Sequence, residues 1–365
     1  MVSKKLIAIL VVFALVAGTA FAVDLGGEVI GVTNVMSKKG AEDDATAFTG
    51  PGVQRVRLEG SGDAEIGVGT VGGWVRFDTS WGGTAEAWGL AWWSPIEQLK
   101  IQIGADPDGM YDTSHIGRYG FYAQANEIGL VTWDATGSFD NGVFGGSFGF
   151  QHFALIIDPI EGLNINVALP LNAQAVDPDE KQISAAFKAA LFQVNYSADF
   201  GAIHVTYQGR PADYVAGKFW GSVYLGSLVE GLGLELGLGF GFAEENAAKP
   251  PLGIALGVRY DSGAFGIKLR SIFEIPMEDG DKTAVRVDVL PSFAISDSVS
   301  VFADIGIYLT GADEQFAWHL APYVRIGPEW GPGFYAGLKF DNGKGTKDVD
   351  DKVNIAIPVG IIAKF

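Results

Sequence analysis

The stretch VNIAIPVGIIAKF, residues 353–365, decides the fold. Every second residue in it, from Val353 to Phe365, is apolar. Successive side chains of a β-strand point to opposite faces, so these residues share one face of a strand. A soluble sheet buries such a face against a core. A membrane barrel turns it towards lipid instead, and needs a closing strand to remove its last edge.

The opposite end of the chain has the pattern of an export signal, which we assign to residues 1–22. Lys4 and Lys5 precede an apolar run over residues 6–16, and Ala20-Phe21-Ala22 has the small-residue spacing of a cleavage site. The run is too short to span a bilayer as a helix, so cleavage is favoured over a retained anchor. Residues 23–365 are then expected to form the exported protein.

Composition narrows the class of this exported protein. The 365 residues include 51 glycines, no cysteine and 12% aromatic residues, and the formal net charge is −18. Removing the two lysines of the signal moves the charge from −18 to −20, which makes nucleic acid an unsuitable partner. Without cysteine there is no disulfide framework. Glycine at about twice its usual share, together with many aromatic residues, is typical of a β-barrel rather than of a disordered chain.

Alternating segments of about ten residues recur along the chain, as they do in transmembrane β-barrels. In residues 232–242, leucine or phenylalanine occupies every second position, and glycine fills the positions between them except at Glu235. A face of large apolar residues backed by glycine suits lipid on one side and an open lumen on the other. The segments predict an all-β, antiparallel, up-and-down transmembrane barrel of about 18 strands, with about 16 as the alternative.

The connections between these segments predict two different rims. Outer-membrane barrels have short turns on one rim and longer loops on the other. Short turns are expected at residues 227–231, 261–263, 295–298 and 327–333, and longer acidic loops at residues 36–52, 172–182, 243–251 and 342–351.

Two local features are also predicted. The alternation of Phe187, Ala189 and Leu191 against Lys188 predicts a strand. The change of phase at Gly72 and Gly73 predicts a β-bulge.

Charged residues opposite the apolar faces are candidates to line the lumen. Basic residues outnumber acidic ones there, so the wall is expected to be mildly basic and the excess negative charge to lie in the loops. A solvated polar face without selectivity is the alternative. The candidates are Arg55, Arg57, Arg76, Lys100, Arg259, Lys268, Arg270, Arg286, Arg325, Lys339, Glu235, Asp288 and Asp304.

Residues 106–141 form the longest segment without sustained alternation, and long irregular segments are usually functional or disordered. Its many aromatic residues argue against disorder. If it folds into the lumen, its carboxylates would face a wall of arginines and form a constriction; if it lies outside, it is an acidic rim that favours cations. The candidates for the constriction are Asp106, Asp108, Asp112 and Glu127.

No pattern of catalytic or metal-binding residues stands out. The four histidines are spread over four segments without metal-ligand spacing, and there is no cysteine for a structural zinc site. Ser114 and His115 are adjacent in sequence, which rarely lets a nucleophile and its base face each other. We therefore expect no enzyme activity, no metal and no cofactor.

Taken together, the export signal, the hairpins with short and long ends and the final Phe365 resemble the porin-like channels of Gram-negative outer membranes. This resemblance is architectural and covers the whole mature chain. It implies an outer-membrane location and passive diffusion of small hydrophilic solutes and ions through a water-filled lumen. It also implies contact with outer-membrane lipids, recognition of Phe365 by the barrel-assembly machinery, and compatibility with a homotrimer.

Two other functions fit a barrel of this kind. A transporter of fatty acids or other hydrophobic compounds would need an apolar path and usually an N-terminal plug, for which few residues are available. A surface adhesin or structural protein would use the barrel as an anchor, but most loops are short for that purpose.

Overall fold

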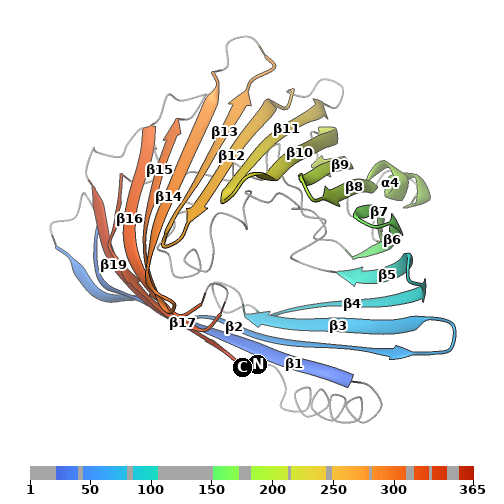
Figure 1. Ribbon diagram of the computed structural model, residues 1–365, viewed down its shortest axis with the longest axis horizontal. Coiled ribbons are helices and arrows are strands. Elements are labelled where there is room, and N and C mark those ends of the chain that lie inside the picture. The colour runs from blue at the N-terminus through green and yellow to red at the C-terminus, as the bar shows by residue number, and fades with distance from the viewer. Residues whose placement is uncertain are drawn as a thin grey trace.

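The protein is a single antiparallel β-sheet closed into a barrel (Figure 1). The structure, a computed structural model, describes residues 22–39, 44–79, 85–105, 151–171, 182–212, 215–243, 249–278, 282–309, 316–328, 331–342 and 353–365. Successive strands pair with their neighbours in sequence order, so the topology is up-and-down.

The first half of the wall contains nine strands and one short helix, α4 (Gln182–Lys188). The strands are β1 (Ala22–Lys38), β2 (Thr46–Glu65), β3 (Thr70–Thr79), β4 (Ala85–Ile96), β5 (Leu99–Ala105), β6 (His152–Ile160), β7 (Leu163–Pro170), β8 (Leu191–Ala198) and β9 (Gly201–Ala212).

The second half continues with the same antiparallel pairing. Its strands are β10 (Val215–Val229), β11 (Leu232–Ala243), β12 (Leu252–Ser262), β13 (Phe265–Ile275), β14 (Ala284–Ser296), β15 (Val299–Leu309), β16 (Phe316–Ile326), β17 (Gly333–Gly337), β18 (Lys339–Asp341) and β19 (Asn354–Lys364).

The barrel closes where β19 pairs with β1, from Glu28↔Lys364 to Lys38↔Ile355. β17 and β18 are separated only by Leu338, and both pair with β16 and β19. They therefore count as one wall strand, and the 19 strands of the sheet make 18 wall strands. This confirms the predicted closed antiparallel barrel and the larger of the two predicted strand numbers.

The two faces of the wall differ as the alternation predicts. On β11, Leu236 is 59% exposed and Leu238 is 50% exposed, whereas Glu235 between its leucine neighbours is buried. On β3, Val75 and Phe77 are exposed while Arg76 and Asp78 are buried. Side chains crowd together on the concave side of a barrel and spread apart on the convex side. The more exposed side chains therefore lie on the convex outer face and the buried ones on the concave inner face. The outer face is apolar, which suits lipid, and the inner face carries the polar groups.

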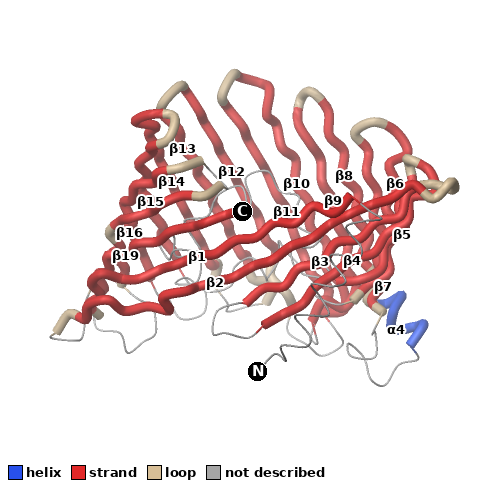
Figure 2. Tube along the Cα trace, turned by 90° about the horizontal axis from the view of Figure 1, so that it is seen from below, coloured by secondary structure: helices blue, strands red, loops and turns tan. Residues whose placement is uncertain are grey.

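The two rims differ as well. Short turns, such as residues 161–162, 230–231, 263–264 and 297–298, gather on one rim, and α4 lies at the other (Figure 2). The short-turn rim also carries the start of β1 and the end of β19, because Ala22 pairs next to the turn after β2 and Phe365 pairs with Gly27. Within the described residues, no helix has the length and apolarity needed to cross a membrane.

The predicted strand around Lys188 is wrong, because residues 182–188 form α4. This stretch contains no glycine or proline, and Gln, Ala and Lys have high helix propensity. Ala189 N–H donates to the Ala185 carbonyl at 3.0 Å, which ends the helix. A β-carbon at Gly209 of β9 would overlap the Lys188 carbonyl oxygen, so glycine is needed where the helix end approaches the wall.

The predicted bulge at Gly72 and Gly73 is also wrong. β3 pairs with β2 and with β4 without a shift in register. Gly72 lies opposite Trp92, and a β-carbon on it would overlap the indole ring. The residue therefore lacks a side chain to make room for Trp92, and the loss of alternation reflects packing rather than an extra residue.

The connection predicted at residues 36–52 is shorter in the structure. β1 continues to Lys38 and β2 begins at Thr46, with Met36 paired to Ala47 and Ser37 to Thr46. This hairpin extends its backbone pairing past the stretch where the side-chain alternation is clear, which the sequence pattern alone does not reveal.

Candidate functional site

The inner face of the wall carries every predicted lumen-lining residue. The strand register places all of them on the same face as the buried polar side chains Glu28, Asp78 and His152. Contacts between inner-face side chains form four groups, three of which contain some of the predicted residues.

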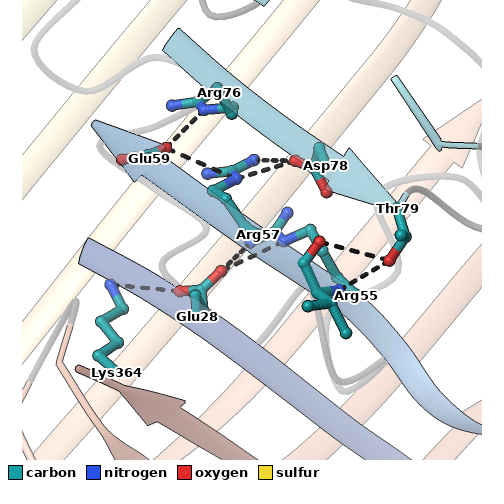
Figure 3. A network of polar contacts seen from close by, with 9 residues as sticks. Glu28, Arg55, Arg57, Glu59, Arg76, Asp78, Thr79 and Lys364 are labelled. Atoms are coloured by element: carbon teal, nitrogen blue, oxygen red, sulfur yellow. Dashed lines mark hydrogen bonds and ion pairs between the residues drawn. The ribbon is translucent and has the colours of Figure 1, made fainter. Parts of the chain in front are cut away.

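The first region is an ion-pair network across β19, β1, β2 and β3, which we call the seam network (Figure 3). Arg55 Nη2 lies 2.5 Å from Glu28 Oε1, and Lys364 Nζ lies 3.3 Å from Glu28 Oε2. Glu28 thus joins the first strand of the barrel to the second and to the last. The contact crosses the closure of the barrel and stabilises it.

The seam network continues onto β3 (Figure 3). Arg57 Nη2 lies 2.7 Å from Asp78 Oδ2, and Arg57 Nε lies 3.7 Å from Glu59 Oε1. Arg76 Nε donates to Glu59 Oε1 at 2.5 Å, and the Arg76 guanidinium lies 4.8 Å from the centre of the Trp74 ring. Three predicted arginines, Arg55, Arg57 and Arg76, therefore share one network with three carboxylates.

The second region is a buried charge cluster on β13–β16. Arg286 Nε lies 2.7 Å from Asp288 Oδ2, and Arg270 Nη2 lies 3.5 Å from the same oxygen. His319 Nε2 lies 2.6 Å from Asp304 Oδ2. All five side chains are at most 4% exposed, so this cluster contributes to the packing of the wall.

The third region, on β7–β9, is built from amide, hydroxyl and imidazole groups. Asn166 Nδ2 donates to Gln193 Oε1 at 2.7 Å, and Gln193 Nε2 donates to Thr206 Oγ1 at 3.3 Å. His204 Nδ1 lies 2.6 Å from Asn195 Oδ1. These hydrogen bonds connect neighbouring strands, so this part of the inner wall is polar without ion pairs.

The fourth region, which we call the inner apolar cluster, runs across β14–β19 and β1. The rings of Phe302 and Tyr323 are stacked with their centres 4.8 Å apart, and the Arg325 guanidinium lies 5.0 Å from the centre of the Phe302 ring. Its members are Ile30, Val32, Leu290, Phe302, Tyr323, Tyr335 and Ile362.

The remaining predicted residues are placed by other contacts or by the register. Lys100 Nζ lies 5.7 Å from the centre of the Trp92 ring, and Glu235 accepts a hydrogen bond from Ser222 at 2.8 Å. Arg259 pairs with Asp261 at 2.5 Å, and both side chains are about half exposed. Two lysines are placed on the inner face by register alone, Lys268 opposite Arg259 and Lys339 opposite Ala356.

The pairing changes the expected character of the wall. A mildly basic face was predicted, but Arg55, Arg57, Arg76, Arg270 and Arg286 each lie against a carboxylate. The inner face is therefore better described as ion-paired than as basic.

Several residues of these networks were not among the candidates. Glu28 is the most important, and the residues after it on its face are Ile30 and Val32, so alternation does not mark that face as polar. Lys364 could have been predicted as an inner-face residue, because it is the only charged residue opposite the apolar face of residues 353–365. Alternation with Trp318 and Leu320 places His319 on the polar face, but its contact with Asp304 could not be inferred from the sequence, because Asp304 lies on a neighbouring strand.

The constriction candidates Asp106, Asp108, Asp112 and Glu127 lie outside the described residues, as do Ser114 and His115. Residues 1–21 of the predicted signal also lie outside them. Among the described residues, no group of three or more His, Cys, Asp or Glu is placed to hold a metal ion.

Comparisons with known proteins found similarity only among solved structures. No family model and no curated protein matches the chain. A variant of the Rh. blastica porin matches with 13% identity and a TM-score of 0.49, covering 94% of this chain and 100% of the porin. A loop-deletion mutant of OmpT, an outer membrane protein of Vibrio cholerae, matches with 12% identity and a TM-score of 0.49, covering 95% of this chain and 100% of that one.

The architecture of the chain itself indicates its structural class. Only helices and closed barrels satisfy every backbone hydrogen bond within a bilayer. This chain forms a closed sheet of 18 wall strands with an apolar outer face and a polar inner face. This is the architecture of a membrane-spanning β-barrel.

Proposed function

We propose that the protein is an outer-membrane channel through which small hydrophilic solutes and ions diffuse passively. The polar inner face of the barrel supports this proposal best. Barrels of 16–18 strands leave an aqueous channel, whereas barrels of about eight strands are filled by their own side chains.

The charges on the inner wall agree with weak selectivity among ions. Each arginine of the seam network lies within a few ångströms of a carboxylate, so their fields largely cancel at a distance. A solute in the middle of the lumen would meet little net charge from this part of the wall. We therefore propose a general diffusion channel rather than a strongly anion-selective or cation-selective one, and no enzyme activity.

The partners we propose follow from the same architecture. Outer-membrane lipids cover the apolar outer face, and the barrel-assembly machinery recognises the last strand with Phe365. A homotrimer remains a further prediction. The constriction by residues 106–141 stays a prediction from the sequence.

Single-channel recording in planar bilayers tests the proposal. Purified protein should give stable conductance steps in potassium chloride, and liposomes that contain it should swell in solutions of small sugars. Absence of both signals from folded, membrane-inserted protein would contradict a diffusion channel.

The inner apolar cluster favours one alternative, a transporter of hydrophobic compounds. An apolar solute needs an apolar path, and this cluster is the largest apolar group on the inner wall among the described residues. Its six core members are at most 8% exposed, however, so they pack against other groups instead of lining an open path. Uptake of a long-chain fatty acid without sugar-dependent swelling would favour the transporter over the channel.

A further inference from the structure

Directly opposed inner-face residues alternate in sign across four consecutive strands. The register places Lys364 of β19 opposite Glu28 of β1, Glu28 opposite Arg57 of β2, and Arg57 opposite Asp78 of β3. The order of charges is positive, negative, positive and negative. Ion-pair contacts of 3.3 Å between Lys364 and Glu28 and 2.7 Å between Arg57 and Asp78 hold the two ends of this row.

The sign also alternates along the strands. On β2, Glu59 follows Arg57 by two residues on the same face, and on β3, Arg76 precedes Asp78 by two. Glu59 and Arg76 are themselves paired across the strands. The wall here carries a two-dimensional pattern in which most charges have neighbours of opposite sign.

A cavity of about 250 Å³ opens beside this pattern, near the short-turn rim. Glu59 and Lys364 border it, and their side chains are 35% and 34% exposed, the most accessible of the network. Gly26 lies directly opposite Glu59 and has room around it, since a β-carbon there would make only ordinary contact at 3.6 Å with the Phe365 oxygen. The lining residues are Gly26, Gly27, Glu28, Arg57, Glu59, Lys364 and Phe365.

Wall charges that alternate in sign discriminate between a solute with one charge and a solute with two opposite charges. Neighbouring strands are roughly 4.8 Å apart, so a singly charged ion that approaches one wall charge is repelled by the next. A solute with a positive and a negative end can satisfy both. The spacing is shorter than the Debye length of about 8 Å at physiological salt, so screening does not remove the effect at contact.

We propose that this cavity is a binding site for small zwitterionic solutes, of which free α-amino acids are the simplest class. The carboxylate of the solute lies towards Lys364 and Arg57, and its ammonium group lies towards Glu59. The cavity is small, which limits the site to solutes of this size. The proposal rests on the proposed channel function, because the site lies on the wall of the lumen.

The experiment compares two solutes of similar size that differ in charge, L-alanine and lactamide. Liposomes that contain the full chain are assayed for swelling in each solute, and conductance in potassium chloride is recorded from the same preparations. The test variants are Glu59→Gln and Lys364→Gln. The matched control is Asp261→Asn, which removes one half-exposed carboxylate of an ion pair on β12.

We expect the unmodified protein to pass alanine faster than lactamide at low solute concentration. Each test variant should lower this ratio about threefold, which is the size expected from a partly exposed ion pair, and the control should leave it unchanged. Gly26→Val adds a separate test, because it fills the cavity without removing a charge and should lower the ratio as well. Saturation-transfer NMR with alanine on detergent-solubilised protein measures binding without requiring permeation.

The possible results separate the two proposals. An open channel with the same alanine-to-lactamide ratio in the unmodified protein and in all variants, and no saturation transfer to alanine, overturns the zwitterion site and leaves the channel standing. Protein that passes neither salt nor either solute overturns the channel and this site together.

Discussion

The His319 imidazole lies against Gly306 on the inner face, where β16 pairs with β15. The two residues are directly opposed in the register, and a β-carbon on Gly306 would overlap the imidazole ring. The same ring is held by Asp304 at 2.6 Å. The glycine thus leaves the space in which the buried histidine–carboxylate contact forms.

Replacing Gly306 with alanine should destabilise the barrel, because the ring must leave Asp304 or the backbone must move. Overpacking of this kind costs about 1–3 kcal/mol, measured as the free energy of unfolding in urea with lipid vesicles. Gly26→Ala is the control, since its new methyl group fits, and it should change the free energy by less than about 0.5 kcal/mol. Equal stability of the two variants would contradict the packing described for His319.

Replacing Asp288 with asparagine should also destabilise the barrel, by about 3–5 kcal/mol, because Arg286 and Arg270 would keep their buried charges without this carboxylate. Asp261→Asn is the comparison, because its partner Arg259 is half exposed and the pair should contribute at most about 1 kcal/mol. The measurement is again the free energy of unfolding. A loss at Asp288 no larger than the loss at Asp261 would show that the buried cluster is solvated.

A charge on the outer face should cost most at the middle of the membrane. Leu236 lies near the middle of β11 and is 59% exposed, whereas Ile295 lies near the turn after β14 and is 60% exposed. Leu236→Arg should cost roughly 2–4 kcal/mol, and Ile295→Arg roughly 0–1 kcal/mol. Because exposure is the same, a difference in unfolding free energy reports depth in the bilayer. Equal costs would mean that this face does not lie in lipid.

Deleting Phe365 should impair assembly. Phe365 N–H donates to the Gly27 carbonyl at 3.1 Å, and Gly27 N–H donates to the Phe365 oxygen at 2.7 Å, so the deletion removes the last backbone pair of the closure. The amount of heat-modifiable, membrane-inserted protein measures the effect. Phe365→Tyr keeps an aromatic side chain and the backbone pair, and should assemble normally. Full assembly of the deletion variant would remove the role proposed for this residue.

Much of the fold follows from the sequence because the barrel repeats one simple rule. Along residues 232–242 the side chains alternate between the outer and the inner face, and alternation is a local property that neighbouring residues reveal. The helix α4 does not follow this rule and was wrongly predicted as a strand. Three alternating residues, Phe187, Ala189 and Leu191, were too few to separate a period of 2 from a period of 3.6, and the helix propensity of the preceding residues was the stronger signal.

The site was less predictable, because ion pairing depends on the register between strands. Alternation shows that Arg57 and Asp78 share the inner face, but only the pairing of β2 with β3 shows that they are opposite each other. Glu28 illustrates the same limit, since it joins β2 and β19, which lie at the two ends of the chain. A sum of charges along the wall therefore predicted a basic lumen where the structure has ion pairs.

The inner apolar cluster has a consequence for the electrical behaviour of the barrel. Current is carried by hydrated ions, which need water beside them, and the buried side chains from Leu290 to Ile30 occupy part of the cross-section with dry groups. Under the proposed channel function, the conducting bore is narrower than the outline of the backbone on the side of β14–β19 and β1. Two barrels with the same number of strands can differ in conductance because of such a cluster alone.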